Sequence, residues 1–257
     1  MSGIINNPLS GFLRSPDRDE VMQFIKRLRP YTIEHPLIRV GPNFDGGYLL
    51  PDDLVDVKSC YSPGVGGSSN FELSLAQRGI HSFMADASVD GPAASHPLFS
   101  FEKKFLGTED FGDYTTLASW IKRHTPTDYN LILQMDIEGS EYPVINSTPE
   151  EVFSRFRIMN IEFHHFHLLW DRKSLDNLNI FFDKLLKKFT IIHLHPNNCE
   201  VGFVKEGITI PPVLEITFLR NDRIKQKSPA QFFPHALDVD NAPHLTTFTL
   251  PSEWYKD

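Results

Sequence analysis

The 257-residue chain carries a formal net charge of −8, with 40% hydrophobic and 23% charged residues. This composition supplies enough apolar residues for a sizeable core in an α/β domain. The negative charge argues against phosphate-backbone binding as the main activity, because proteins that bind nucleic acids carry basic patches. We therefore expect no nucleic-acid partner, and the sequence leaves the oligomeric state open, a homo-oligomer included.

The two cysteines, Cys60 and Cys199, are too few for a disulfide framework, so a reducing compartment is expected. The N-terminus lacks a basic stretch followed by an apolar run, as a signal peptide would have. No apolar segment approaches the roughly 20 residues that span a bilayer. These features predict a cytoplasmic protein without a membrane span.

Residues 1–50 predict an N-terminal helix followed by a hairpin. Asp17 and Asp19 are both suited to cap the helix, and Pro30 ends it. The apolar stripe of this helix consists of Val21, Phe24, Ile25 and Leu28. Residues 38–50 then predict two short strands around an Asp-Gly-Gly turn at residues 45–47.

Strands and helices alternate from residue 57 onward. The expected strands are residues 57–62, 81–85, 98–102, 130–136, 157–163, 189–195 and 212–219, and the expected helices are residues 70–79, 114–124, 141–147 and 174–188. Strands that are apolar throughout, such as residues 131–133, are typical of a parallel sheet covered by helices on both faces. We expect a core over residues 51–220, a C-terminal wrap over 221–257 along the sheet edge, and a single domain over 1–257.

A glycine cluster lies between the first expected core strand and its helix. Residues 60–72 read Cys-Tyr-Ser-Pro-Gly-Val-Gly-Gly-Ser-Ser-Asn-Phe-Glu, so that Gly64 and Gly66 fall in the turn. Glycine allows sharp turns and close approach of a ligand, and a strand, a glycine-rich turn and a helix often hold nucleotide-like cofactors. Asp86 ends the next strand about 20 residues later, where an acidic residue binds ribose hydroxyls in such folds. The pattern predicts an adenosine-containing cofactor, although glycine turns also occur for purely structural reasons.

Polar residues follow three further strands, at the edge where parallel sheets bind ligands. Asp136 ends the fourth strand, Glu162 with His164 and His165 ends the fifth, and His195 ends the sixth. Helix capping, the helix dipole and ordinary structural hydrogen bonds offer alternative explanations for most of them. Glu162 is harder to explain in this way, because an unpaired carboxylate in a buried strand needs a cation or a strong donor. Oxygen and nitrogen donors of this kind suit Mg, Mn, Fe or Zn, with Asp136, Glu162 and His164 as the candidate ligands.

Three segments of the chain resemble the FkbM-type methyltransferases. They are residues 39–48 (RVGPNFDGGY), residues 61–72 with the glycine turn, and residues 133–142 (LQMDIEGSEY), the last being the most specific mark of the family. The resemblance implies the class I methyltransferase fold: a Rossmann-like, doubly wound, mostly parallel seven-stranded sheet with an antiparallel edge strand, plus the N-terminal helix and hairpin. It also implies S-adenosylmethionine as cofactor and methyl transfer to a hydroxyl of a sugar, glycan or natural product.

Matched to the family segments, several residues acquire expected roles. Cofactor binding is implied for Asp45, Gly46, Gly64, Gly66, Glu72, Asp86 and Asp136. Because a sugar hydroxyl is a poor nucleophile, either a base must remove its proton or a metal must lower its pKa. We expect Asp136, Glu162 and His164 to do one of these, directly or through an ion, with His165 and His195 nearby.

Two other functions compete with methyl transfer. A nicotinamide oxidoreductase would share the adenosine and the glycine turn, but the sequence lacks a glycine three residues after Gly66. A non-catalytic carbohydrate-binding or scaffold protein could keep the fold without turnover.

Overall fold

The computed structural model describes residues 14–127 and 130–256. Its core is a seven-stranded sheet with the order β11-β14-β10-β9-β4-β5-β6. The strands are β4 (Ser59–Pro63), β5 (His81–Ala85), β6 (Phe99–Glu102), β9 (Leu131–Met135), β10 (Phe156–Phe163), β11 (Phe189–Pro196) and β14 (Leu214–Arg220). All seven match expected strands to within a few residues.

The sheet is parallel except at β14, which runs antiparallel to both β10 and β11. The class I methyltransferase fold is thus confirmed, with one correction. The antiparallel strand is not at the edge of the sheet, because β11 pairs along its outer side and forms the edge instead.

Six α-helices accompany the sheet in the described part of the chain: α1 (Arg18–Arg27), α2 (Asn70–Ala76), α3 (Leu117–His124), α4 (Glu141–Ser147), α5 (Glu150–Phe153) and α6 (Arg172–Leu186). Asp17, rather than Asp19, caps α1, and it forms a capping box with Glu20. Helix α3 begins three residues later than expected, because Tyr114 and Thr115 form a short strand instead. Helix α5 is one turn long, and its four residues give no periodic pattern that would predict it.

The remaining elements are short. The hairpin expected at residues 38–50 is confirmed as β2 (Leu37–Val40) and β3 (Tyr48–Pro51). Three further pairs were not predicted: β1 (Tyr31–Ile33) with β15 (Lys227–Pro229), β7 (Phe105–Leu106) with β8 (Tyr114–Thr115), and β12 (Phe203–Lys205) with β13 (Ile208–Ile210). The 3-10 turns are η1 (Phe166–Trp170), η2 (Asn221–Arg223) and η3 (Ser252–Trp254).

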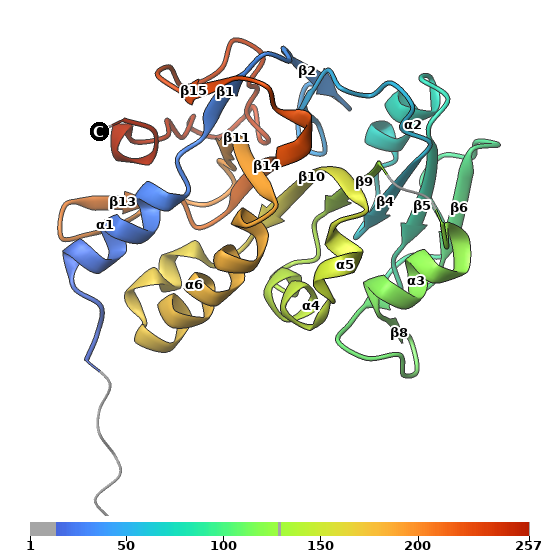
Figure 1. Ribbon diagram of the computed structural model, residues 1–257, viewed down its shortest axis with the longest axis horizontal. Coiled ribbons are helices and arrows are strands. Elements are labelled where there is room, and N and C mark those ends of the chain that lie inside the picture. The colour runs from blue at the N-terminus through green and yellow to red at the C-terminus, as the bar shows by residue number, and fades with distance from the viewer. Residues whose placement is uncertain (1–13, 128–129, 257) are drawn as a thin grey trace, which may run out of the picture.

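Two apolar layers enclose the sheet (Figure 1). Helices α1, α3, α4 and α6 cover one face, where Phe182 of α6 and Trp120 of α3 lie in one cluster with Leu133 of β9. Helix α2 and the β2–β3 hairpin cover the other face, where Phe71 and Leu50 pack in a second cluster that includes Ile132. Neighbouring residues of β9 therefore belong to opposite layers, as the two-residue repeat of a strand requires.

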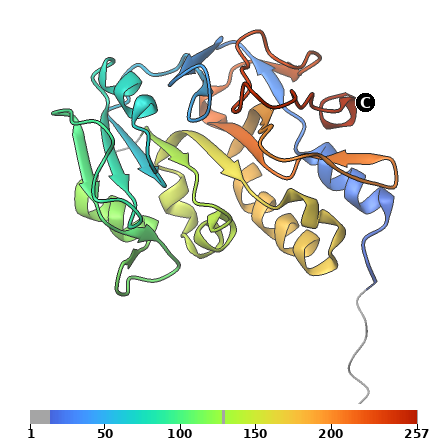
Figure 2. The same ribbon diagram turned by 180° about the vertical axis from the view of Figure 1, so that it is seen from behind.

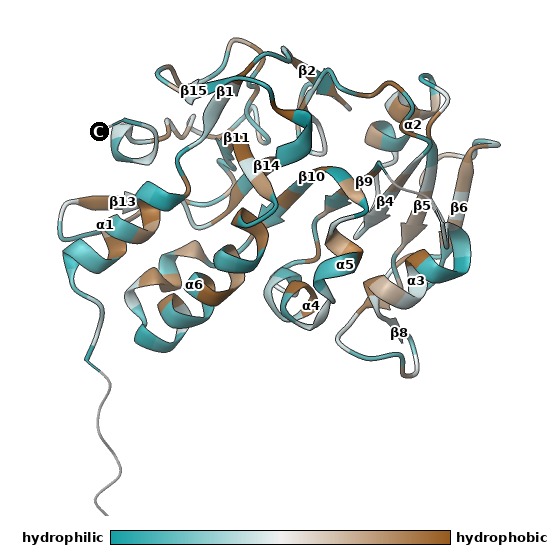
Figure 3. Ribbon diagram, in the orientation of Figure 1, coloured by the Kyte–Doolittle hydropathy of each residue, from teal (hydrophilic) through white to brown (hydrophobic). Residues whose placement is uncertain are grey.

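The view from behind shows the C-terminal segment folding back over the same side of the sheet as the β2–β3 hairpin (Figure 2). Apolar residues concentrate on the strands and on the inward sides of the helices (Figure 3). Within the described part of the chain, no helix is both long and apolar enough to cross a membrane.

Candidate active site

The turn after β4 brings two strands into unusually close contact. Gly64 has φ +81°, and a Cβ atom at this position would lie 1.6 Å from the carbonyl oxygen of Asp136. The Gly64 amide donates to the carbonyl of Ala85 over 2.9 Å, so that the turn is fastened to the end of β5 as well. Only glycine fits a left-handed backbone with no space for a side chain. The local structure thus explains Gly64 as a packing requirement that also opens the cleft beside it.

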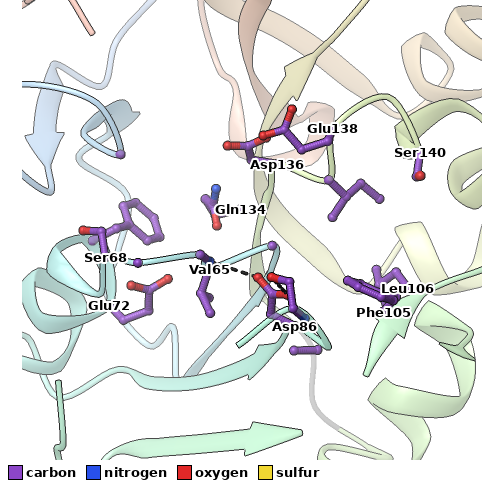
Figure 4. Close-up of a pocket in the computed structure, with 18 of the residues that line it drawn as sticks. Val65, Ser68, Glu72, Asp86, Phe105, Leu106, Gln134, Asp136, Glu138 and Ser140 are labelled. Carbon is purple, nitrogen blue, oxygen red and sulfur yellow. Dashed lines mark hydrogen bonds between the residues drawn. The ribbon is translucent and has the colours of Figure 1, made fainter. Parts of the chain in front are cut away.

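A cleft with a volume of about 740 Å³ lies beyond the carboxyl ends of β4, β5 and β9. Figure 4 shows Asp136 and Glu138 pointing together at one end, while Asp86 lies near Phe105 and Leu106 at the other. A cleft at this edge is where open parallel sheets bind their ligands. All the residues matched to cofactor binding line it, namely Asp45, Gly46, Gly64, Gly66, Glu72, Asp86 and Asp136.

Asp86 is held in place by the glycine turn itself. The Gly66 amide donates to its Oδ2 over 3.0 Å, and the amide and hydroxyl of Ser88 donate to its Oδ1. The carboxylate is buried against the turn but faces the cleft. It is therefore preorganised as an acceptor for ligand hydroxyl groups.

The other end of the glycine turn carries a second buried carboxyl group. Ser62 Oγ lies 2.5 Å from Glu72 Oε1 and 2.6 Å from Gln134 Oε1. Burial raises the pKa of Glu72, while the hydrogen bond from Ser62 acts in the opposite direction. The oxygen atoms of Ser62, Glu72 and Gln134 thus have one hydroxyl proton between them. A ligand group that is positively charged or donates a hydrogen bond would therefore be stabilised here.

Sequence reasoning missed one wall of the cleft. Phe105, Leu106 and Tyr114 line it from the β7–β8 pair, and the rings of Phe105 and Tyr114 lie 5.8 Å apart. Both rings are substantially exposed, which is unusual for large apolar side chains with no ligand beside them. The two strands have only two residues each, so no alternation could predict them. The aromatic residues Phe105 and Tyr114 were the available sequence signal for this wall of the cleft.

His164 lies among four carboxylates. Its Nδ1 is 3.2 Å from Glu141 Oε1, and that same oxygen accepts the amides of Ile137 and Gly139. Its Nε2 is 3.4 Å from an oxygen of Glu138 and 3.8 Å from oxygens of both Asp136 and Glu162. Burial lowers the pKa of His164, but the Glu141 hydrogen bond and the carboxylate charges outweigh it and raise the pKa above the ordinary value.

Asp136 and Glu162 both keep an oxygen without a partner. Asp136 Oδ1 and Glu162 Oε2 are buried and accept no hydrogen bond from the described residues. Burial raises the pKa of Asp136 to about 7, with His164 opposing the shift and Glu138 adding to it. Burial likewise raises the pKa of Glu162, whose Oε1 accepts from the Asn197 side chain over 3.1 Å.

The antiparallel strand adds a carboxyl group that sequence reasoning missed. Glu215 of β14 pairs directly with Glu162 of β10 on one side and with His195 of β11 on the other. Burial raises the pKa of Glu215 to about 8, and Asn241 donates to its Oε1 over 2.7 Å. Asn241 also donates to Asp45 Oδ1, so the C-terminal segment joins the sheet to the edge of the cleft.

The structure brings Asp136, Glu162 and His164 together but separates the other two histidines from them. His165 has a left-handed backbone with φ +63° and an exposed side chain, with its ring centroid 6.2 Å from that of His164. His195 lies instead beside Asp238 and Asn241 of the C-terminal segment. At the cleft, the potential metal ligands with donor atoms within 4.8 Å of one another are Asp136, Glu138 and His164.

Comparison with known protein families identifies a methyltransferase family. The family model described as "Methyltransferase FkbM domain" matches residues 56–203. Searching the curated proteins by sequence gives no match. Similar solved structures include three methyltransferases, all of low identity to this chain.

Magnesium protoporphyrin IX methyltransferase from Synechocystis PCC 6803, with bound SAH, is 15% identical, with 66% of this chain and 76% of that chain covered and a TM-score of 0.36. The N-methyltransferase NodS from Bradyrhizobium japonicum WM9 is 11% identical, covering 64% and 86%, with a TM-score of 0.34. A TehB-like SAM-dependent methyltransferase from Corynebacterium glutamicum is 12% identical, covering 80% and 89%, with a TM-score of 0.34. Because the family model covers more than half of the sequence, the chain belongs to the FkbM methyltransferase family and is an S-adenosylmethionine-dependent methyltransferase.

Proposed function

We propose that the protein transfers the methyl group of S-adenosylmethionine to a hydroxyl group of a sugar, a glycan or a natural product. The observation that carries this proposal is Asp136, a half-buried carboxyl at the cleft with one buried oxygen that has no hydrogen-bond partner and a pKa raised to about 7. A general base works best when its pKa lies near the operating pH, and a hydroxyl nucleophile needs one. The proposal takes residues 1–257 as a single methyltransferase domain.

The lining of the cleft suggests how the cofactor lies in it. Phe105 and Tyr114 are placed to contact the adenine ring, and Asp86 to accept the ribose hydroxyls. Glu72, with Ser62 and Gln134, would receive the ammonium group of the methionine end. The sulfonium would then lie between these two ends, in the part of the cleft that Asp136 lines. Alignment of nucleophile, methyl carbon and sulfur supplies much of the rate enhancement in such a displacement.

A divalent ion fits the same end of the cleft. Asp136, Glu138 and His164 would hold it, with Glu162 beside them, and the Glu141 carboxylate would orient the His164 ring. A carboxylate behind a histidine is the usual arrangement around a bound metal. Magnesium or manganese at this position would lower the pKa of the acceptor hydroxyl.

The test of the proposal is turnover and binding in matched variants. Asp136→Asn should lower kcat by about 10²- to 10⁴-fold, the range for loss of a general base, while calorimetry shows S-adenosylhomocysteine still bound. The control is Asp52→Asn, an exposed position. Acceptors would be screened with labelled cofactor over short glycans and sugars, in the presence and absence of EDTA. Loss of activity in EDTA, restored by Mg²⁺ or Mn²⁺, indicates the metal, and undiminished activity of Asp136→Asn contradicts the assignment.

Calorimetry with S-adenosylhomocysteine and with NAD separates the competing functions. Binding of the first ligand alone supports the transferase. Binding of neither ligand would favour a non-catalytic scaffold that has kept the fold.

A further inference from the structure

A second cluster of histidine and carboxylate groups lies outside the cleft. His193 and His195 are two residues apart on β11, so both side chains point to the same face of the sheet. Asp238, from the C-terminal segment, lies against both of them. The side chains of these three residues are only 4%, 13% and 6% exposed, respectively. None of the three lines the cleft.

The spacing of the donor atoms matches a metal site. Asp238 Oδ1 is 2.8 Å from His193 Nε2 and 3.5 Å from His195 Nδ1, and the three donor atoms lie within 4.8 Å of one another. Zinc binds nitrogen and oxygen donors at about 2.0–2.2 Å in a tetrahedron, so neighbouring donors should be about 3.3 Å apart. The two measured separations lie on either side of this value.

The hydrogen bonds around His195 indicate which nitrogen carries the proton. Asn241 donates through Nδ2 to Glu215 Oε1 and to Asp45 Oδ1, so its side-chain oxygen is the atom that faces His195. His195 Nε2 lies 3.1 Å from this oxygen and must donate to it. In a neutral imidazole the other nitrogen, Nδ1, then presents a lone pair.

The lone pair of His195 Nδ1 therefore faces a carboxylate oxygen at 3.5 Å. In this tautomer the two acceptors repel each other, and a metal ion between them would offset the repulsion. The same Asp238 oxygen lies within hydrogen-bond distance of His193 Nε2, at 2.8 Å, so the ion would replace that hydrogen bond.

We propose that His193, His195 and Asp238 bind one divalent transition-metal ion, with zinc as the ion that best suits two imidazoles and one carboxylate. A water molecule would complete a four-coordinate site. Asn241 would then act behind His195 as the partner that orients its ring, as outer hydrogen bonds commonly do for metal-bound histidines.

The ion would fasten the C-terminal segment to the edge strand of the sheet. Asn241 lies three residues after Asp238 and contacts Asp45 at the cleft. A change in the position of the C-terminal segment would therefore be transmitted to the cofactor-binding edge. The inference does not depend on the acceptor or on methyl transfer, because its readout is metal binding.

The experiment uses the full-length chain, stripped of metal with a chelator and titrated calorimetrically with Zn²⁺. The wild-type protein should bind Zn²⁺, its melting temperature should rise with Zn²⁺ but not with Mg²⁺, and an anomalous diffraction peak should lie between His193, His195 and Asp238. His195→Gln should weaken Zn²⁺ binding by more than the roughly 10- to 100-fold that loss of an outer hydrogen bond costs.

Two controls locate the ion. His244→Gln, an exposed histidine in the same segment, should keep wild-type affinity. Asp136→Asn should keep the Zn²⁺ binding that belongs to this cluster, because it removes one potential ligand in the cleft and none in the cluster. The proposal is overturned if wild-type crystals soaked in Zn²⁺ show no peak at this cluster, or if Asp136→Asn abolishes binding while His195→Gln does not. The wild-type diffraction measurement decides the matter even if the His195→Gln variant fails to fold.

Discussion

At the scale of single residues, the site depends on positions where the backbone conformation and the surrounding atoms allow only one residue type. Gly64 is the clearest case, because it combines φ +81° with contact against the Asp136 carbonyl. The sequence could indicate this glycine from the motif, but not the reason for it, since the neighbouring strand is about 70 residues away in the chain. Glu162 was also predictable, as a carboxyl group within an apolar strand. Glu215 carries the same signal, but it was missed because it lies at the start of its strand, whereas the ligand-binding residues of a parallel sheet are sought at the strand ends.

Gly64→Ala should destabilise the protein much more than Gly79→Ala. Gly79 has φ +75° with no atom within 4 Å of an added Cβ, so only the left-handed backbone is penalised. That penalty is about 1–2 kcal/mol. Gly64→Ala adds a backbone clash and should exceed about 4 kcal/mol or prevent folding. Urea unfolding of both variants measures the difference. Equal losses of stability would show that β4 and β9 can move apart without an energetic cost.

At the scale of elements, the apolar runs predicted every strand of the main sheet because burial on both faces leaves a continuous signal. Short elements escaped prediction. The β7–β8 pair is held by tertiary contacts and by Asp110, which accepts hydrogen bonds from Thr115, Thr116 and Ser119 at the start of α3. Such contacts form only after the chain has folded, so the local sequence carries little trace of them.

Asp110→Ala should lower the free energy of unfolding by about 1 kcal/mol at pH 7, the usual net contribution of a side-chain hydrogen bond. Burial acts to raise the pKa of Asp110, but hydrogen bonds from Ser119 and Thr116 hold it at about 2, against 3.8 in the unfolded chain. A lowered pKa stabilises the fold above pH 3.8, and this stabilisation is lost as the pH falls toward 2. The difference between wild type and variant should therefore be smaller at pH 3 than at pH 7. Denaturant unfolding at both pH values checks this, with Asp113→Ala in the same loop as the control; a constant difference would exclude the carboxylate as the cause.

At the scale of the whole molecule, the C-terminal segment does more than cover an edge. The sequence predicted a wrap, but its polar contacts were invisible, because Asp238 and Asn241 meet residues that lie 26 to 196 positions away in the chain. Asn241 joins Glu215 of the sheet, Asp45 of the cleft and His195 of the edge strand. The family resemblance implied a seven-stranded, mostly parallel sheet, which apolar periodicity by itself does not contain, but it placed the antiparallel strand at the edge, where the structure has β11.

Asn241→Ala should cost about 1–3 kcal/mol of stability, since it leaves the buried Glu215 oxygen without its donor. Hydrogen exchange should also increase at residues 41–47, because the link from Asn241 to Asp45 is lost. Asn146→Ala, at an exposed position, is the control. Unchanged hydrogen exchange in residues 41–47 would mean that the β2–β3 hairpin keeps its position without the contact to the C-terminal segment.

The reversed direction of β14 changes where its functional residues are found. In a strand that runs the other way, the first residues and not the last arrive at the ligand-binding edge, which is why Glu215 stands one residue after β14 begins. Substitutions near the start of this strand should thus alter chemistry, whereas those at Leu219 and beyond should alter only packing. A search that considers only the residues downstream of each strand therefore overlooks Glu215.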